Sequence, residues 1–61
     1  MHAIDRAILE LGLDDFHPLK SLRGRIAQGP LYRHVLRLLK LGWLQKQGTL
    51  YQTTESGRRR R

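Results

Sequence analysis

Residues 31–42 have the sequence LYRHVLRLLKLG, the most regular helical pattern in the chain. At about 100° per residue, its apolar side chains gather on one side of a helix and its cationic side chains on the other. The apolar side comprises Leu31, Val35, Leu38 and Leu39, and the cationic side comprises Arg33, Arg37 and Lys40. Because Pro30 can open a helix and Gly42 can end one, we expect a helix over about residues 30–41, buried on one side only.

Two shorter amphipathic segments come before this helix. In the first, Ile4, Ala7, Ile8 and Leu11 recur at helical spacing, and the charged residues Asp5, Arg6 and Glu10 lie elsewhere around the helix. Gly12 follows, which predicts a helix over residues 3–11. The second begins at Pro18 and continues through Leu19, Leu22 and Ile26, which predicts a helix over residues 18–26. Since only the short break at residues 27–30 separates it from the next helix, the pair is a candidate helix-turn-helix.

After Gly42 the sequence becomes typical of strands. WLQKQ and TLYQTT flank Gln47 and Gly48, which predicts a tight β-hairpin. Between the first two helices, Phe16 is expected to enter the core as a short extended piece. We therefore expect an α+β fold, mostly α, in a single domain over residues 1–57. Residues 58–61 are four arginines, and their mutual repulsion predicts a disordered basic tail.

The composition argues against several classes of protein. The chain of 61 residues contains no cysteine, and no apolar run approaches the ~18 residues that span a bilayer. Acids interrupt the first apolar stretch, so we expect no signal peptide and a soluble, cytoplasmic protein. No carboxylate pair, nucleophile with its base or glycine-rich phosphate loop is present, so we expect no catalytic site and no cofactor. The three histidines do not have the spacing of metal ligands, and we expect them to be surface or capping residues. They are His2, His17 and His34.

Charge is distributed unevenly along the chain. The net charge is +7, yet four of the five acids lie within the first fifteen residues. Residues 16–54 contain seven lysines and arginines and no acid. A generally soluble basic surface would mix both signs of charge. The one-sided charge therefore favours a polyanionic partner, either nucleic acid or an anionic membrane surface.

Residues 31–44, LYRHVLRLLKLGWL, and residues 51–59, YQTTESGRR, resemble the winged-helix transcription regulators of the MarR and PadR type. The resemblance covers residues 19–59 loosely and residues 31–57 well. The matching positions are Leu31, Tyr32, Arg33, Val35, Arg37, Leu38, Gly42, Leu44, Tyr51, Thr54, Glu55 and Gly57. It implies a three-helix winged helix-turn-helix with a two-stranded β-hairpin wing.

The resemblance also implies a DNA-binding surface. The helix over residues 30–41 would lie in the major groove of double-stranded DNA, with base or phosphate contacts from Tyr32, Arg33 and Arg37. The wing would meet the adjacent backbone around Lys46 and Gly48. Further cationic contacts are expected from Lys20, Lys40, Arg58 and Arg59, because lysine and arginine bind phosphate.

Other functions remain open at this point. A small transcription regulator is the expected function, and an architectural, excisionase-like DNA-binding factor is the alternative. A further alternative is a winged helix that contacts protein or RNA. Another is a cationic membrane-binding peptide, which the segment RHVLRLLKL suggests because its leucines lie beside cations. The additional leucines, Leu36, Leu39 and Leu41, are either extra core or a surface for a homodimer or another protein partner. Trp43 and Tyr51 are expected in the core.

Overall fold

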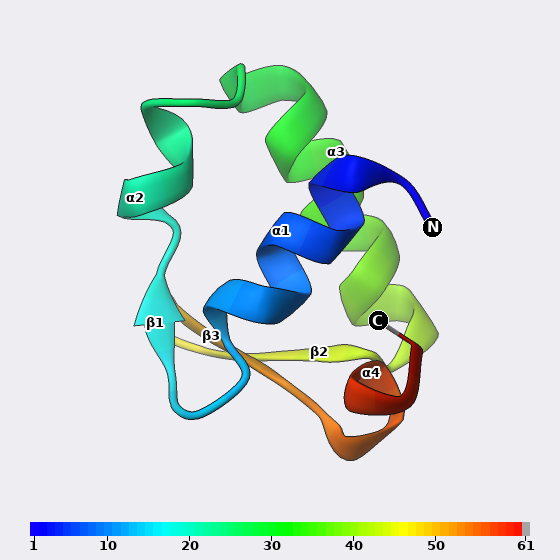
Figure 1. Ribbon diagram of the computed structural model, residues 1–61. Coiled ribbons are helices and arrows are strands. Elements are labelled where there is room, and N and C mark those ends of the chain that lie inside the picture. The colour runs from blue at the N-terminus through cyan, green and yellow to red at the C-terminus, as the bar shows by residue number, and fades with distance from the viewer. Residues whose placement is uncertain (61) are drawn as a thin grey trace.

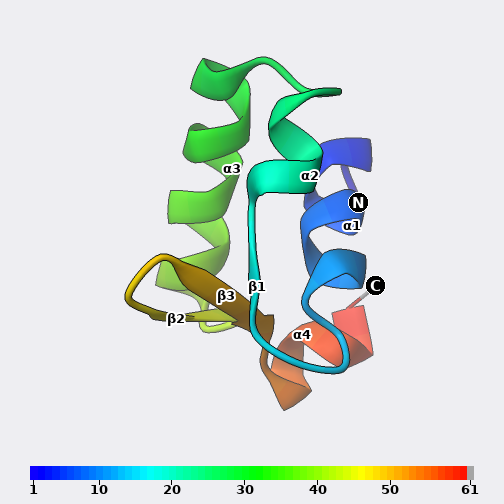
Figure 2. The same ribbon diagram turned by 90° about the vertical axis from the view of Figure 1, so that its left-hand side faces the viewer.

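The computed structural model describes residues 1–60, which form four helices and a three-stranded antiparallel sheet (Figure 1). The fold is therefore α+β and mostly helical, as the sequence predicts. In chain order the elements are α1 (Ala3–Leu11), β1 (His17–Pro18), α2 (Lys20–Arg23), α3 (Gln28–Leu41), β2 (Leu44–Gln47), β3 (Leu50–Thr53) and α4 (Glu55–Arg60). In both ribbon views α1 and α3 lie above the sheet, and α4 lies below α1 (Figures 1 and 2).

The core lies where the first three helices meet the sheet. Its buried apolar side chains are Ile8, Leu9, Leu19, Leu22, Leu31, Val35, Leu38, Leu44 and Tyr51. Of the predicted apolar side of α3, three residues are buried and Leu39 packs against the core from its edge. Trp43 is half-buried at this edge, whereas Tyr51 is buried, as predicted.

The inward side of α1 is wider than predicted. Of the residues expected to face the core, Ile8 is buried, and Ile4, Ala7 and Leu11 pack against the core half-buried. Leu9 is buried in addition. Asp5, predicted on the outer side, is 2% exposed. The spacing of Asp5, Ile8 and Leu9 is itself helical, so one acid shares the inward stripe.

The boundaries around the second helix also differ from the expectation. α2 covers Lys20–Arg23 instead of residues 18–26, because Pro18 is paired in the sheet and Gly24 follows the last helical residue. α3 begins earlier than predicted, at Gln28. Pro30 then occupies the first turn, where a backbone N–H has no helical partner to lose.

The sheet has the order β1-β3-β2. β1 consists of two residues, and its register pairs His17 with Tyr51 and Pro18 with Leu50. The extended piece expected near Phe16 is therefore a third strand one residue later. Phe16 itself is half-buried and does not belong to the core.

β2 and β3 are joined by Gly48 and Thr49, so the loop lies one residue later than predicted. Gly48 has φ +62°, and no residue other than glycine has a positive φ within residues 1–60. A positive φ at only the first loop position is the pattern of a type II′ turn.

β3 is also joined to the end of α1. The hydroxyl of Thr53, which is 3% exposed, donates to the Leu9 carbonyl at 2.6 Å. The Thr53 N–H donates to the Gly12 carbonyl at 2.9 Å. The last carbonyls of a helix lack helical partners, so these bonds satisfy groups that burial would otherwise leave unpaired.

The basic C-terminal run is helical where we expected disorder. Arg58, Arg59 and Arg60 form the last turn of α4, while Arg61 lies outside the described residues. Thr54 begins the helix: its hydroxyl accepts from the Gly57 N–H at 3.2 Å and its N–H donates to the Trp43 carbonyl at 3.0 Å. Cations near a helix C-terminus also complement the helix dipole.

Gly57 provides a test of this docking. A Cβ added at Gly57 would overlap the carbonyl oxygen of Trp43, whereas one added at Gly24 would meet only open space. We expect Gly57→Ala to lower the free energy of unfolding by about 1–3 kcal/mol, although alanine favours helix over glycine. Gly24→Ala, the matched control, should be neutral or gain up to about 1 kcal/mol. Urea unfolding measures both, and equal stability of the two variants would contradict the docking of α4.

Candidate nucleic-acid interface

α3 has one face that no other element covers. The exposed residues that we call the α3 outer face are Gly29, Arg33, Leu36, Arg37 and Lys40. Gln28, Pro30 and Leu41, at the two ends of the helix, are also exposed. Leu31, Val35 and Leu38 lie on the opposite side and are buried, so the predicted division of this helix is confirmed. All five acids of the chain lie in other parts of the sequence, in α1, in the loop after it and in α4. The α3 outer face is therefore purely cationic in its charged residues.

A buried acid holds one edge of this face. The Asp5 carboxylate accepts from His34 Nδ1 at 2.7 Å and from Arg37 Nη1 at 3.3 Å. The Asp5 side chain is 3% exposed, whereas that of Arg37 is 59% exposed. A buried carboxylate requires such partners, because it has lost its hydration. Since a guanidinium has five N–H donors, Arg37 keeps donors directed to solvent while one is held by α1.

Sequence reasoning missed this contact between α1 and α3. His34 was expected as a surface or capping residue, but it is half-buried and bonded to Asp5. His2 does cap α1, since its Nδ1 accepts from the Ile4 N–H at 3.1 Å, and its ring centroid lies 4.5 Å from that of His34. The available signal was the helical spacing that places Asp5 on the stripe of Ile8.

Tyr32 lies at the other edge of the helix. It is half-buried against the core, and its hydroxyl accepts from Arg23 Nη2 at 3.1 Å. This bond joins α2 to α3. Tyr32 therefore flanks the α3 outer face with its hydroxyl toward α2, instead of standing fully on the polar side as we predicted.

The β2–β3 hairpin lies beside this face. Lys46 and Gly48 are exposed, and β2 packs against α3. Figure 2 shows the hairpin loop projecting past α3, on the side turned away from α1. The structure thus places the predicted hairpin beside α3.

Three other predicted residues lie elsewhere. Lys20 lines a hollow of about 430 Å³ together with side chains from α1 and β1. Arg58 and Arg59 belong to α4, which Figure 2 shows on the opposite side from the hairpin loop. Arg58 Nη2 donates to the Leu13 carbonyl at 2.6 Å, and Arg59 pairs with Glu55 at 3.1 Å. These cations are not brought together with the α3 outer face.

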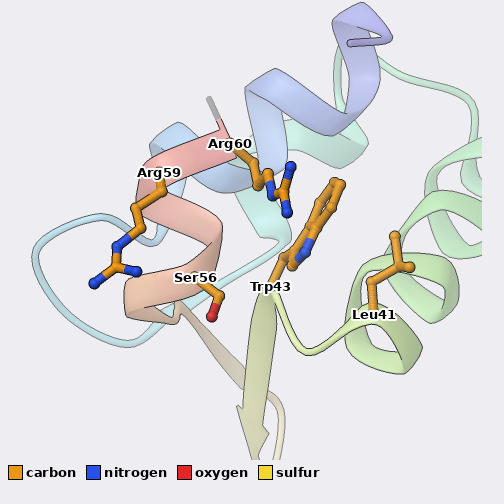
Figure 3. Close-up of a pocket in the computed structure, with 5 residues that line it drawn as sticks. All are labelled: Leu41, Trp43, Ser56, Arg59 and Arg60. Carbon is orange, nitrogen blue, oxygen red and sulfur yellow. The ribbon is translucent and has the colours of Figure 1, made fainter.

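A cleft of about 440 Å³ separates α4 from the end of α3 (Figure 3). The guanidinium carbon of Arg60 lies 5.3 Å from the ring centroid of Trp43, within the range of a cation–π interaction. Figure 3 shows Leu41 on the other side of this indole. Two residues that line this cleft therefore form a contact between α4 and the residue before β2.

The additional leucines have divided roles. Leu39 packs against the core, whereas Leu36 and Leu41 are 65% and 45% exposed. Leu36 lies within the α3 outer face, and Leu41 lines the cleft of α4. The interpretation of these residues as extra core is thus correct for Leu39 only.

Comparison of the chain with models of protein families, with curated proteins and with solved structures found no match. None of the helices in residues 1–60 is long and apolar enough to cross a membrane. Within the same residues, no group of three or more potential ligands is placed to hold a metal ion.

The Asp5 contact leads to a stability prediction. Asp5→Ala removes the acceptor of both His34 and Arg37, and we expect it to lower the free energy of unfolding by about 1–3 kcal/mol. Asp14→Ala, a change of equal charge in the exposed loop, should stay within about 0.5 kcal/mol of the unmodified protein. Thermal and urea unfolding compare the two variants, and similar values for both would mean that the pair adds nothing to stability.

Proposed function

We propose that this protein binds double-stranded DNA as a winged helix-turn-helix domain. α3 enters the major groove, and the β2–β3 hairpin serves as the wing against the adjacent backbone. The observation that carries the proposal is the α3 outer face, which exposes Arg33, Arg37 and Lys40 without any neighbouring acid on the helix. A helix in the major groove needs such a face opposite the one that packs on its own domain.

The chemistry of this face suits a duplex. Arginine can bind the guanine edge or a phosphate with two parallel hydrogen bonds, and lysine binds phosphate as a point charge. Arg33 and Lys40 are separated by seven positions, or about two helical turns, so they would contact the duplex at different positions along the groove. The helix diameter of about 10–12 Å also fits the major groove, which is about 12 Å wide.

The supporting elements agree with this arrangement. α2 and α3 are joined by a short segment, residues 24–27, as in a helix-turn-helix. The Arg23–Tyr32 bond ties these two helices, and the Asp5 pairs tie α1 to α3. Lys46 then extends the cationic surface onto the hairpin. A rigid support of this kind keeps side chains in register with base edges.

A regulator of transcription is the role that we propose, in preference to a purely architectural factor. Arginines on the groove-facing side of a helix provide contacts that distinguish one base pair from another. A protein that only bends or coats DNA needs phosphate contacts, which carry no sequence information. The preferred site would therefore be bound more tightly than a random duplex.

The first prediction of this proposal concerns salt. If the four cations of the proposed interface, Arg33, Arg37, Lys40 and Lys46, each contact a phosphate, we expect the logarithm of the binding constant to fall against the logarithm of the salt concentration with a slope of about −3.5. Fluorescence anisotropy of a labelled random duplex of about 20 base pairs measures the slope. Binding that does not respond to salt would contradict an electrostatic interface.

The second prediction concerns sequence selectivity. Arg33→Ala should weaken binding to a site obtained by in vitro selection by about 1–3 kcal/mol, and should weaken binding to random duplex less. Arg6→Ala removes the same charge from an exposed position of α1, and we expect it to affect both duplexes weakly and equally. Equal losses for Arg33→Ala on the two duplexes would reject direct base contact by this residue.

A further inference from the structure

Leu36 occupies an unusual place in the α3 outer face. It is 65% exposed, more than Met1, Leu41 or Leu50, the other exposed large apolar side chains of residues 1–60. Arg33 precedes it by three positions and Lys40 follows by four, while its other neighbours at helical spacing, Tyr32 and Leu39, are half-buried. An exposed apolar side chain thus borders the cations of the α3 outer face.

The fold does not account for this leucine. Leu36 belongs neither to the core nor to the half-buried residues packed against it. Pairing of this face with a second copy would bring the three cations of each copy against their counterparts, which is unfavourable. A duplex offers phosphates to the cations and an apolar group to the leucine at the same time.

We infer that Leu36 contacts the 5-methyl group of a thymine, and that the preferred site contains this thymine beside the bases reached by Arg33. The inference rests on the proposed function. The thymine methyl is the one apolar group that the four natural bases present in the major groove, and apolar side chains contact it there. Leu36 lies near the middle of α3, about one helical turn after Arg33.

Removal of one methyl group isolates this contact, because uracil and thymine pair identically and differ in that group alone. Sites are first obtained by in vitro selection with the full chain, and each thymine is then replaced by deoxyuridine in turn. We expect the affinity of the unmodified protein to fall about fourfold at one or two positions, the value of burying one methyl or methylene group. Replacement at the other positions should leave the affinity unchanged.

The variant Leu36→Ala should bind the thymine and deoxyuridine forms of the site equally. Leu41→Ala, which shortens an exposed leucine of the same helix outside the α3 outer face, is the matched control and should keep the fourfold difference. Circular dichroism checks that both variants are folded, as expected for changes at exposed positions.

Several outcomes would overturn the inference. One is that no deoxyuridine replacement changes the affinity of the unmodified protein. Another is that Leu36→Ala keeps the same ratio of affinities for the thymine and deoxyuridine forms. The third is that in vitro selection returns no preferred site. Each of these outcomes is still compatible with the proposed function if salt-dependent binding to random duplex is observed. If the protein binds no duplex at all, both the proposed function and the thymine contact are wrong. A dimer in sedimentation velocity that Leu36→Ala dissociates would assign the leucine to a second copy instead.

Discussion

The burial of Asp5 between α1 and α3 is the contact on which the arrangement of the molecule depends. A carboxylate with 3% of its side chain exposed needs charged or polar partners, and both partners come from α3. The geometry of His34 and Arg37 therefore fixes how α3 lies on α1. Because His34 and Arg37 are three positions apart, they lie on the same side of α3, and this side is held by α1. The adjacent side of the helix, the α3 outer face, stays uncovered.

The outer and inner faces of α3 have complementary roles. Inside, its leucines close a small core, and stability in a chain of 61 residues without cysteine depends on such packing. Outside, the same helix carries cations next to a hairpin whose loop projects on that side. The proposed interface is thus formed by the elements that are best supported by the core, in agreement with the rigidity that base recognition requires.

The sequence predicted what local patterns determine. Leu31, Val35 and Leu38 follow helical periodicity, and the structure buries all three. β1 has no local pattern, since two residues become a strand only by pairing with β3, and Pro18 suits a helix start equally well. α4 was missed because its contacts are distant in sequence: Arg58 reaches Leu13, and Gly57 fits against the Trp43 carbonyl. Helical periodicity was sufficient to group the exposed cations of α3, whereas Arg58 and Arg59, which we grouped with them, lie on α4.

In the proposed complex, the α3 outer face and the hairpin loop meet the duplex together. Titration of ¹⁵N-labelled protein with duplex DNA, followed by NMR, would locate this interface residue by residue. We expect amide shifts and line broadening to concentrate at Arg33, Leu36, Lys40 and Gly48, while α4 and the exposed side of α1 change little. Perturbations centred on Arg59, Arg60 and Trp43, with α3 unaffected, would contradict it.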